Sequence, residues 1–190
     1  NGIDSVTVTD GEFESLANVS ISDGHYTELA EEAVQNAIDG KVIAFEAAMS
    51  HGKPQVTWVE IQLDENGEME DITIDVLQSS ITQTAGVDTP EDDTDDTFEF
   101  AWNDETKQEL GYAYRMHGQR ELSEADYITW LADNDKLEWF EQAEIIQNEW
   151  LENGVDSITP VEGEFESLAD VSISDGGYVA LAQEAFNKIG

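Results

Sequence analysis

The chain has 190 residues, 44 of them acidic and 7 basic, with a formal net charge of −37. Nucleic acids and anionic membrane surfaces bind basic footprints, so this charge excludes both as partners. The absence of Cys excludes disulfides, thiolate catalysis and iron–sulfur clusters, and no stretch is apolar enough to predict direct insertion into a membrane. The acidic surface favours a salty exterior environment, with cation binding by acidic clusters as the alternative.

The chain opens with two short β-prone runs, residues 3–8 and 18–22. A helix is predicted next over Tyr26–Ile38, with Ser22 and Asp23 as candidate capping residues at its start. The helix carries one apolar stripe, formed by Leu29, Ala30, Ala33, Val34 and Ala37.

A three-stranded antiparallel meander is predicted after this helix. Lys41–Met49 is a nearly continuous apolar run, and Gln55–Leu63 alternates between apolar and polar residues. The turn at residues 64–67 contains an Asn-Gly pair, which is a strong hairpin signal. The return strand places one apolar face on Ile72, Ile74 and Val76.

Residues 83–97 include the run VDTPEDDTDDT, which predicts an acidic surface loop. Its acidic part, Asp88–Asp96, could bind Ca²⁺ weakly; the alternative is a solvated loop without a ligand.

Three helical segments are predicted after the loop. The first is Asp104–Met116, and the second is capped by Ser123 and runs to about Ala132. Asn134 is expected to cap the third, Asp135–Glu152, and Asn153-Gly154 to end it. Its predicted buried face consists of Leu137, Phe140, Ile145 and Trp150. The order of strands and helices predicts an α+β fold, with helices packed on a mostly antiparallel sheet.

Residues 1–38 return near the end of the chain as residues 153–190, with 23 of 38 positions identical at an offset of 152. A repeat of this density predicts a period of one domain. Residues 1–39 are therefore interpreted as the C-terminal tail of a preceding repeat, and residues 40–190 as one complete domain of a tandem array.

The most similar part of the two copies is a short hydroxyl-bearing segment before a helix. It runs over Glu14–Gly24 in the first copy and Glu166–Gly176 in the second. Free N–H groups and the helix dipole at such a position favour a phosphate. The alternative is an ordinary helix cap of the Ser-x-Ser-Asp-Gly type.

This segment resembles the C-terminal motif of the FMN-binding domain family, in particular the extracellular electron-transfer flavoproteins of Gram-positive bacteria. In that family a transferase attaches FMN through a phosphoester to the last hydroxyl of an Asp-x-x-Ser/Thr-Gly-Ala-Ser/Thr motif. The resemblance places the acceptor hydroxyl on Ser20 and Ser172, and it extends through residues 40–76, 107–118 and 137–157. The motif here departs from the family pattern, with Asn18 and Asp170 at its Gly position.

The resemblance implies covalent FMN as cofactor, with the phosphate on Ser20 or Ser172 and neutralised by the amides near Asp23, Gly24, Asp175 and Gly176. The rings against the flavin would come from Tyr26, Tyr178, Tyr112 and Tyr114, and Arg115 could bind the phosphate or the flavin carbonyls. Core packing for the tyrosines and a surface ion pair for Arg115 are the alternatives. No catalytic residue and no metal site are predicted.

Two functions remain open at this point. The first is an extracellular electron-transfer module, an electron carrier rather than an enzyme, in a tandem array with redox partners at the cell surface. The second is a structural repeat without flavin that polymerises head to tail into a fibre or filament. In that case a strand supplied to an open sheet edge is the expected joint between neighbouring units.

Overall fold

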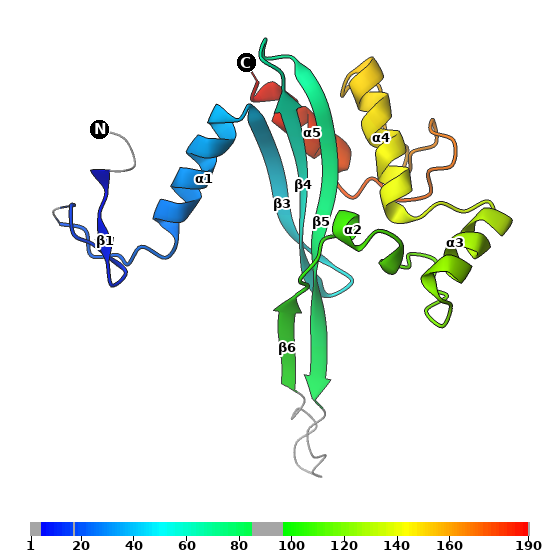
Figure 1. The fold of residues 1–190 in the computed structure, drawn as a ribbon, viewed down its shortest axis with the longest axis horizontal. Coiled ribbons are helices and arrows are strands. Elements are labelled where there is room, and N and C mark those ends of the chain that lie inside the picture. Colours follow the sequence, from blue (N-terminus) through cyan, green and yellow to red (C-terminus); the bar gives the residue numbers. More distant parts are fainter. Residues whose placement is uncertain (1–4, 17, 85–96, 190) are drawn as a thin grey trace.

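The computed structural model describes residues 5–16, 18–84 and 97–189, which form an α+β fold (Figure 1). A curled antiparallel sheet has the order β3-β4-β5-β6, and helices cover one of its faces. Of the predicted acidic loop, residues 85–96 lie outside the described residues, and so does the whole candidate Ca²⁺ segment Asp88–Asp96. No helix among the described residues is long and apolar enough to cross a membrane.

The sheet has four strands rather than the three predicted. β3 (Lys41–Ser50) pairs with β4 (Lys53–Leu63), which pairs with β5 (Met69–Thr84). The predicted meander is therefore present, but β5 continues beyond it and pairs with β6 (Thr97–Trp102). All six residues of β6 are exposed. Phe98, Phe100 and Trp102 alternate as in a strand, a pattern that the prediction left out.

The predicted hairpin turn between β4 and β5 is confirmed. Asp64 accepts hydrogen bonds from the backbone amides of Asn66 and Glu68, both at 2.8 Å, and from Asn66 Nδ2 at 2.9 Å. The side-chain bond from Asn66, followed by the backbone bonds, lowers the pKa of the Asp64 carboxyl. Gly67 closes the turn with φ 79°, a conformation that glycine adopts without steric cost.

The first predicted helix after the sheet is much shorter than expected. α2 spans only Lys107–Leu110 and passes into a 3₁₀ turn, η2 (Gly111–Ala113). Gly111 interrupts the helix with φ 49° and ψ −126°, a conformation that residues with a Cβ rarely adopt. The prediction of a continuous helix over Asp104–Met116 is therefore wrong.

The second predicted helix is confirmed and the third is shifted. α3 (Glu124–Asp133) begins at Ser123, whose hydroxyl accepts the Asp126 amide. α4 (Trp139–Asn153) begins four residues later than predicted because Glu138, rather than Asn134, caps it in a capping box with Glu141. The side chains that α4 buries follow from this start: Trp139, Gln142, Ala143, Ile146 and Trp150. Leu137, Phe140 and Ile145 are only half-buried.

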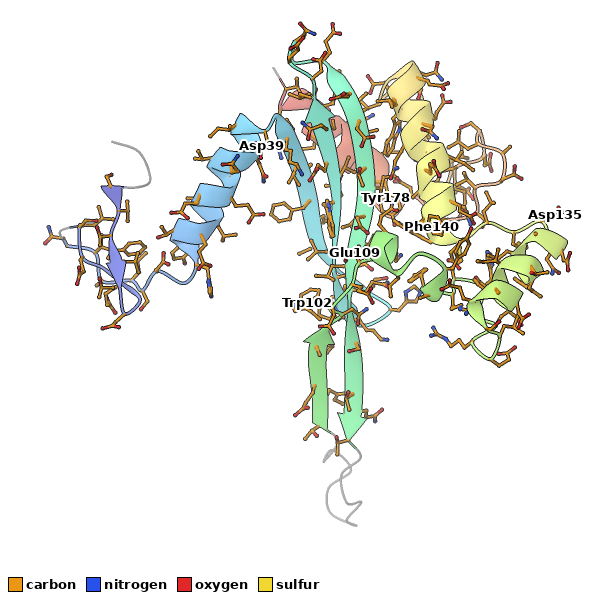
Figure 2. The ribbon with its side chains drawn as sticks, in the orientation of Figure 1. Asp39, Trp102, Glu109, Asp135, Phe140 and Tyr178 are labelled. Carbon is orange, nitrogen blue, oxygen red and sulfur yellow. The ribbon has the colours of Figure 1, made fainter. Side chains whose placement is uncertain are left out.

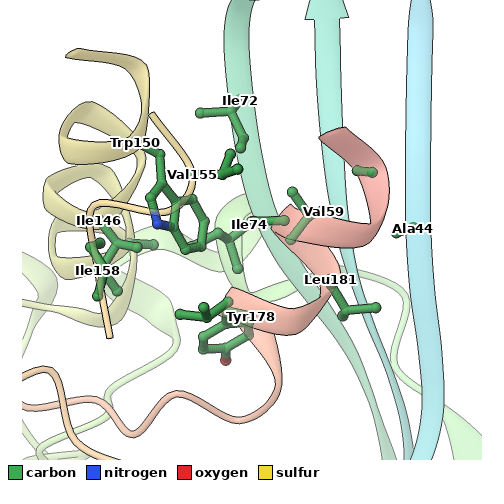
Figure 3. Packing of buried hydrophobic residues seen from close by; sticks show 14 of the residues in the cluster. Ala44, Val59, Ile72, Ile74, Ile146, Trp150, Val155, Ile158, Tyr178 and Leu181 are labelled. Atoms are coloured by element: carbon green, nitrogen blue, oxygen red, sulfur yellow. The ribbon is translucent and has the colours of Figure 1, made fainter. Parts of the chain in front are cut away.

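The core lies between the sheet and the helices α4 and α5 (Tyr178–Asn187). Figure 3 shows Trp150 and Ile146 of α4 facing Ile72 and Ile74 of β5, with Leu181 of α5 nearby. The opposite face of the sheet is uncovered in this chain, with Phe45 and Met49 of β3 exposed. The second copy of the repeat therefore supplies part of the core of residues 40–190.

The first copy stands apart from this core. β1 (Val8–Thr9) and β2 (Glu12–Phe13) form a short hairpin, and α1 (Tyr26–Ile38) follows as predicted. α1 joins β3 at the end of the sheet and lies away from α4 and α5 (Figures 1 and 2). It has no buried residue.

Candidate functional site

The two copies of the repeat share one local backbone structure. In the first, the Asp23 amide donates to Gly11 O at 2.8 Å; in the second, the Asp175 amide donates to Gly163 O at 2.7 Å. The bridge Glu12↔Ser22 recurs as Glu164↔Ser174. Left-handed φ angles also recur, for example 65° at both Asn18 and Asp170. The local sequence therefore produces the same turn structure in two different surroundings.

The left-handed angle bears on the departure from the flavin-attachment motif. Asn18 and Asp170 stand where the family motif has Gly, and both adopt positive φ. Asn and Asp tolerate this region better than other residues with a Cβ, because their short side chains hydrogen-bond locally. The loss of Gly therefore leaves this backbone conformation accessible.

The burial of the two copies differs sharply. Ile173, Tyr178 and Leu181 in the second copy are 7%, 5% and 4% exposed. Their counterparts Ile21, Tyr26 and Leu29 are 60%, 58% and 59% exposed. The same side chains that build the core of residues 40–190 thus form an uncovered apolar surface on residues 1–39.

The second copy is anchored by Gln142 of α4. Gln142 Oε1 accepts the Ser172 amide at 2.6 Å, the Ser172 hydroxyl at 3.2 Å and the Ile173 amide at 3.1 Å. Its Nε2 donates to Leu137 O at 2.9 Å. Ser172, the predicted acceptor, is exposed to solvent, and Gln142 holds its backbone in place.

A fully buried carboxylate, that of Glu138, caps the helix that carries Gln142. Glu138 accepts the amides of Met116 and Trp139 and the hydroxyl of Tyr127. Burial and then the hydrogen bond to Glu138 raise the pKa of Tyr127 to about 12. Arg115 lies 4.2 Å above the Tyr127 ring, and its Nη1 is buried without a hydrogen-bond partner. Arg115 is therefore half-buried against Tyr127, and its Nη2 donates to Leu122 O at 3.2 Å.

Several amides at the start of each helix are already bonded, among them those of Asp23 and Asp175, which donate to Gly11 O and Gly163 O. Asp175 Oδ1 accepts the Val179 amide at 2.9 Å, and Asp175 O accepts the Tyr178 amide at 2.9 Å. In the first copy, Asp23 accepts the Thr27 and Tyr26 amides in the same way. The start of each helix is thus capped by its own aspartate, which leaves these donors unavailable to an anion.

A crevice lies beside the second copy. One pocket of about 280 Å³ is lined by Asp170, Lys136 and neighbouring residues, and another of about 160 Å³ by Tyr112 and Glu141. The two pockets share the lining residues Leu131, Ala132, Lys136 and Leu137. Asp170 and the predicted ring residue Tyr112 therefore border one continuous depression, and Lys136 is the cation within it.

The other predicted ring residues are distributed differently. Tyr26 is exposed on α1, far along the chain from any crevice residue. Tyr178 is buried and packs edge-on against Trp139, with ring centroids 6.4 Å apart. Tyr114 and Trp139 both lie 5.0 Å from Lys107 Nζ. Of the four tyrosines, only Tyr112 lines this crevice.

The lysine between these rings is itself unusual. Burial lowers the pKa of Lys107 to about 8, and the nearby Asp75 carboxylate opposes that shift. The two aromatic faces offset part of the cost of burying its charge. Lys107 is thus a structural cation in the core rather than part of the crevice.

The pH dependence of stability provides a test of this burial. The pKa of Lys107 is lower in the folded state than in the unfolded state, so unfolding takes up a proton between pH 8 and about 10.5. We expect the free energy of unfolding to rise by about 1–2 kcal/mol from pH 8 to 10 and to fall above pH 10. The fall arises because Tyr114, Tyr127 and Tyr178 have raised pKa values.

Urea unfolding at a series of pH values measures this profile. Lys107→Met should lose the rise between pH 8 and 10, whereas Lys136→Met, which changes an exposed lysine, should keep it. A rise that persists in Lys107→Met would show that another group is responsible.

Sequence reasoning found Ser172, Asp170 and Tyr112 but missed Gln142, Glu138 and Lys136. A buried Gln and a buried Glu on a helix are indistinguishable by pattern from exposed ones, since polar residues normally face solvent. The identical Ser172 and Ser20 segments carried the available signal. The described residues contain no group of three or more His, Asp or Glu side chains that could hold a metal.

The fold and the site define a small α+β protein with a repeated hydroxyl-bearing turn. No protein-family model, curated protein or solved structure matches the chain.

Proposed function

We propose that this chain is a repeat unit of an end-to-end extracellular array, in which each body is completed by a tail of the type seen in residues 153–190. The observation that carries this is the contrast in burial between two nearly identical segments. An apolar surface of this kind on an acidic protein is normally an interaction site. Head-to-tail contacts that do not close on themselves produce filaments.

The connection between residues 1–39 and residues 40–190 supports an array with a fixed geometry. Only Asp39 and Gly40 separate α1 from β3, and Gln62 Nε2 donates to Asp39 O at 2.7 Å. The Leu63 amide donates to Gly40 O at 2.8 Å. A Cβ at Gly40 would lie 3.1 Å from Leu63 O, so the close approach requires glycine. A short, hydrogen-bonded joint holds neighbouring units at a fixed angle.

Negative-stain electron microscopy of a chain of four 152-residue periods tests this proposal. We expect a rod with a regular repeat. Separate particles joined at variable angles would contradict it. The high negative charge makes 0.15 M salt the appropriate condition, because screening relieves repulsion between units.

A second candidate is a flavin carrier of the extracellular electron-transfer type, favoured by the exposed Ser172, which follows the crevice residue Asp170 by two positions. FMN attached there would supply the redox chemistry, which makes the chain an electron carrier rather than an enzyme. Lys136, not the capped amides of α5, is the group available to the phosphate. The Asp170 carboxylate opposes a phosphate at this position. The flavin role is compatible with an array.

Intact mass and a visible spectrum test the second candidate after co-expression with a flavin transferase. The flavin role predicts a covalent FMN adduct on Ser172, absent from Ser172→Ala and retained in Ser174→Ala. A colourless chain of unmodified mass would exclude it, provided that a known substrate of the same transferase is flavinylated in parallel.

A further inference from the structure

We infer that residues 1–39 close the body of a second unit by occupying the surface that α5 and its preceding turn occupy in this chain. The inference rests on the proposed array and names its contact. The partner is a body of the same kind as residues 40–152.

The main observation is that every buried position of the second copy has an identical or similar residue at the equivalent position of the first copy. Six of these pairs are identical: Phe13 and Phe165, Ile21 and Ile173, Tyr26 and Tyr178, Leu29 and Leu181, Ala30 and Ala182, Ala33 and Ala185. The other three exchange residues of similar shape: Ile3 and Val155, Val6 and Ile158, Thr27 and Val179. Close packing tolerates the two aliphatic exchanges. The Thr27 hydroxyl, which Val179 lacks, donates to Asp23 Oδ1 at 2.7 Å, so the first copy has a side chain suited to each buried position of this surface.

The larger differences between the copies fall on the outward side. Val34 corresponds to Phe186, and both are about half exposed. Glu28, Glu31 and Asn36 correspond to Ala180, Gln183 and Lys188, none of which is buried. Apart from the three buried exchanges given above, the described positions that vary are not buried in the second copy, although Gly177 and Lys188 contact β3.

One of the exchanges requires a small adjustment. Gly177 starts α5, and a Cβ built there would lie 3.3 Å from Glu46 Oε2 on β3, closer than an ordinary van der Waals contact. His25 occupies this position in the first copy with a left-handed backbone, and its Nδ1 lies 2.8 Å from Glu28 Oε2. On a neighbouring body, the side chain of Glu46 would therefore shift to admit the Cβ of His25.

The contact differs from the expected strand addition. No strand of residues 153–189 joins the four-stranded sheet; the segment contributes instead a turn and a helix that cover one face of the sheet. Lys188 Nζ donates to Ile43 O at 3.1 Å, so α5 ends beside the start of β3 (Figure 1). A helix docked on a face, rather than a strand on an edge, is therefore the geometry of the joint.

The test adds a second body to the full chain, by placing another copy of residues 40–152 before Asn1. Because the period is 152 residues, this addition restores the natural register. Hydrogen exchange is measured on the amides of α1 in the one-body and two-body chains. We expect their protection to rise at least about 100-fold in the two-body chain and to approach that of α5. Unchanged exchange would overturn the inference.

A matched pair of substitutions separates docking from general stabilisation. In the two-body chain, Leu29→Asp should abolish the new protection, and Val34→Asp, on the outward side, should retain it. Equal effects of the two would also overturn the docking geometry. Electron microscopy tests the array separately from this contact. Rods whose α1 amides remain unprotected would refute only the contact. Protected amides without rods would refute only the array.

Discussion

Leu181→Asp is expected to unfold residues 40–190, whereas Leu29→Asp in the same chain is expected to leave their stability within about 0.5 kcal/mol. Leu181 is 4% exposed and Leu29 is 59% exposed, although the two occupy equivalent places in the repeat. Loss of a buried Leu costs about 2–5 kcal/mol, and the buried carboxylate adds to this cost. We expect a total loss of more than about 4 kcal/mol for Leu181→Asp.

Urea unfolding followed by tryptophan fluorescence measures this difference, because all five tryptophans lie between residues 58 and 150. Phe186→Asp, on the outward side of α5, is the control for the helix itself. Similar losses for Leu181→Asp and Leu29→Asp would mean that both copies are packed in this chain, contrary to the exposed α1.

Glu138→Ala is the second substitution with a large expected effect. Glu138 is fully buried and accepts hydrogen bonds from Tyr127, Met116 and Trp139. Its removal leaves these donors buried without an acceptor and opens a cavity, at a cost of about 3–5 kcal/mol. Gln142 of α4 contacts Met116 Sδ and accepts the Ser172 amide, so the Ser172 amide should also exchange faster.

Thermal unfolding and hydrogen exchange of the Ser172 amide measure the two effects. Glu144→Gln, which changes an exposed carboxylate on the same helix, should alter neither. A wild-type melting temperature for Glu138→Ala would show that the buried carboxylate contributes no net stability.

The parts of the fold that sequence predicted well depend on neighbours within a few residues. The Asn66-Gly67 turn, the helix Tyr26–Ile38 and the cap at Ser123 each follow from local hydrogen bonds and periodicity. The prediction failed where distant groups decide. α2 ends at Gly111 while Asp75, more than thirty residues earlier, accepts the Gln108 amide at 3.1 Å.

The candidate site divides in the same way. The repeated turn was visible as identity between Ser20 and Ser172, but its anchor Gln142 lies 30 residues from Ser172 in the sequence. Gln142 falls on the helical stripe of Trp139, Ala143, Ile146 and Trp150, but a polar residue on a helix is normally expected to face solvent. The crevice between Lys136 and Tyr112 likewise depends on how α3 and α4 pack.

The amino-acid sequence by itself determined the acidic surface, the absence of thiol chemistry, the hairpin and the shared turn structure of the two copies, since these follow from composition and local bonding. Only the tertiary structure decided that one copy is core and the other is surface. Burial depends on whether a complementary body is present, and identical side chains such as Leu29 and Leu181 cannot encode that difference.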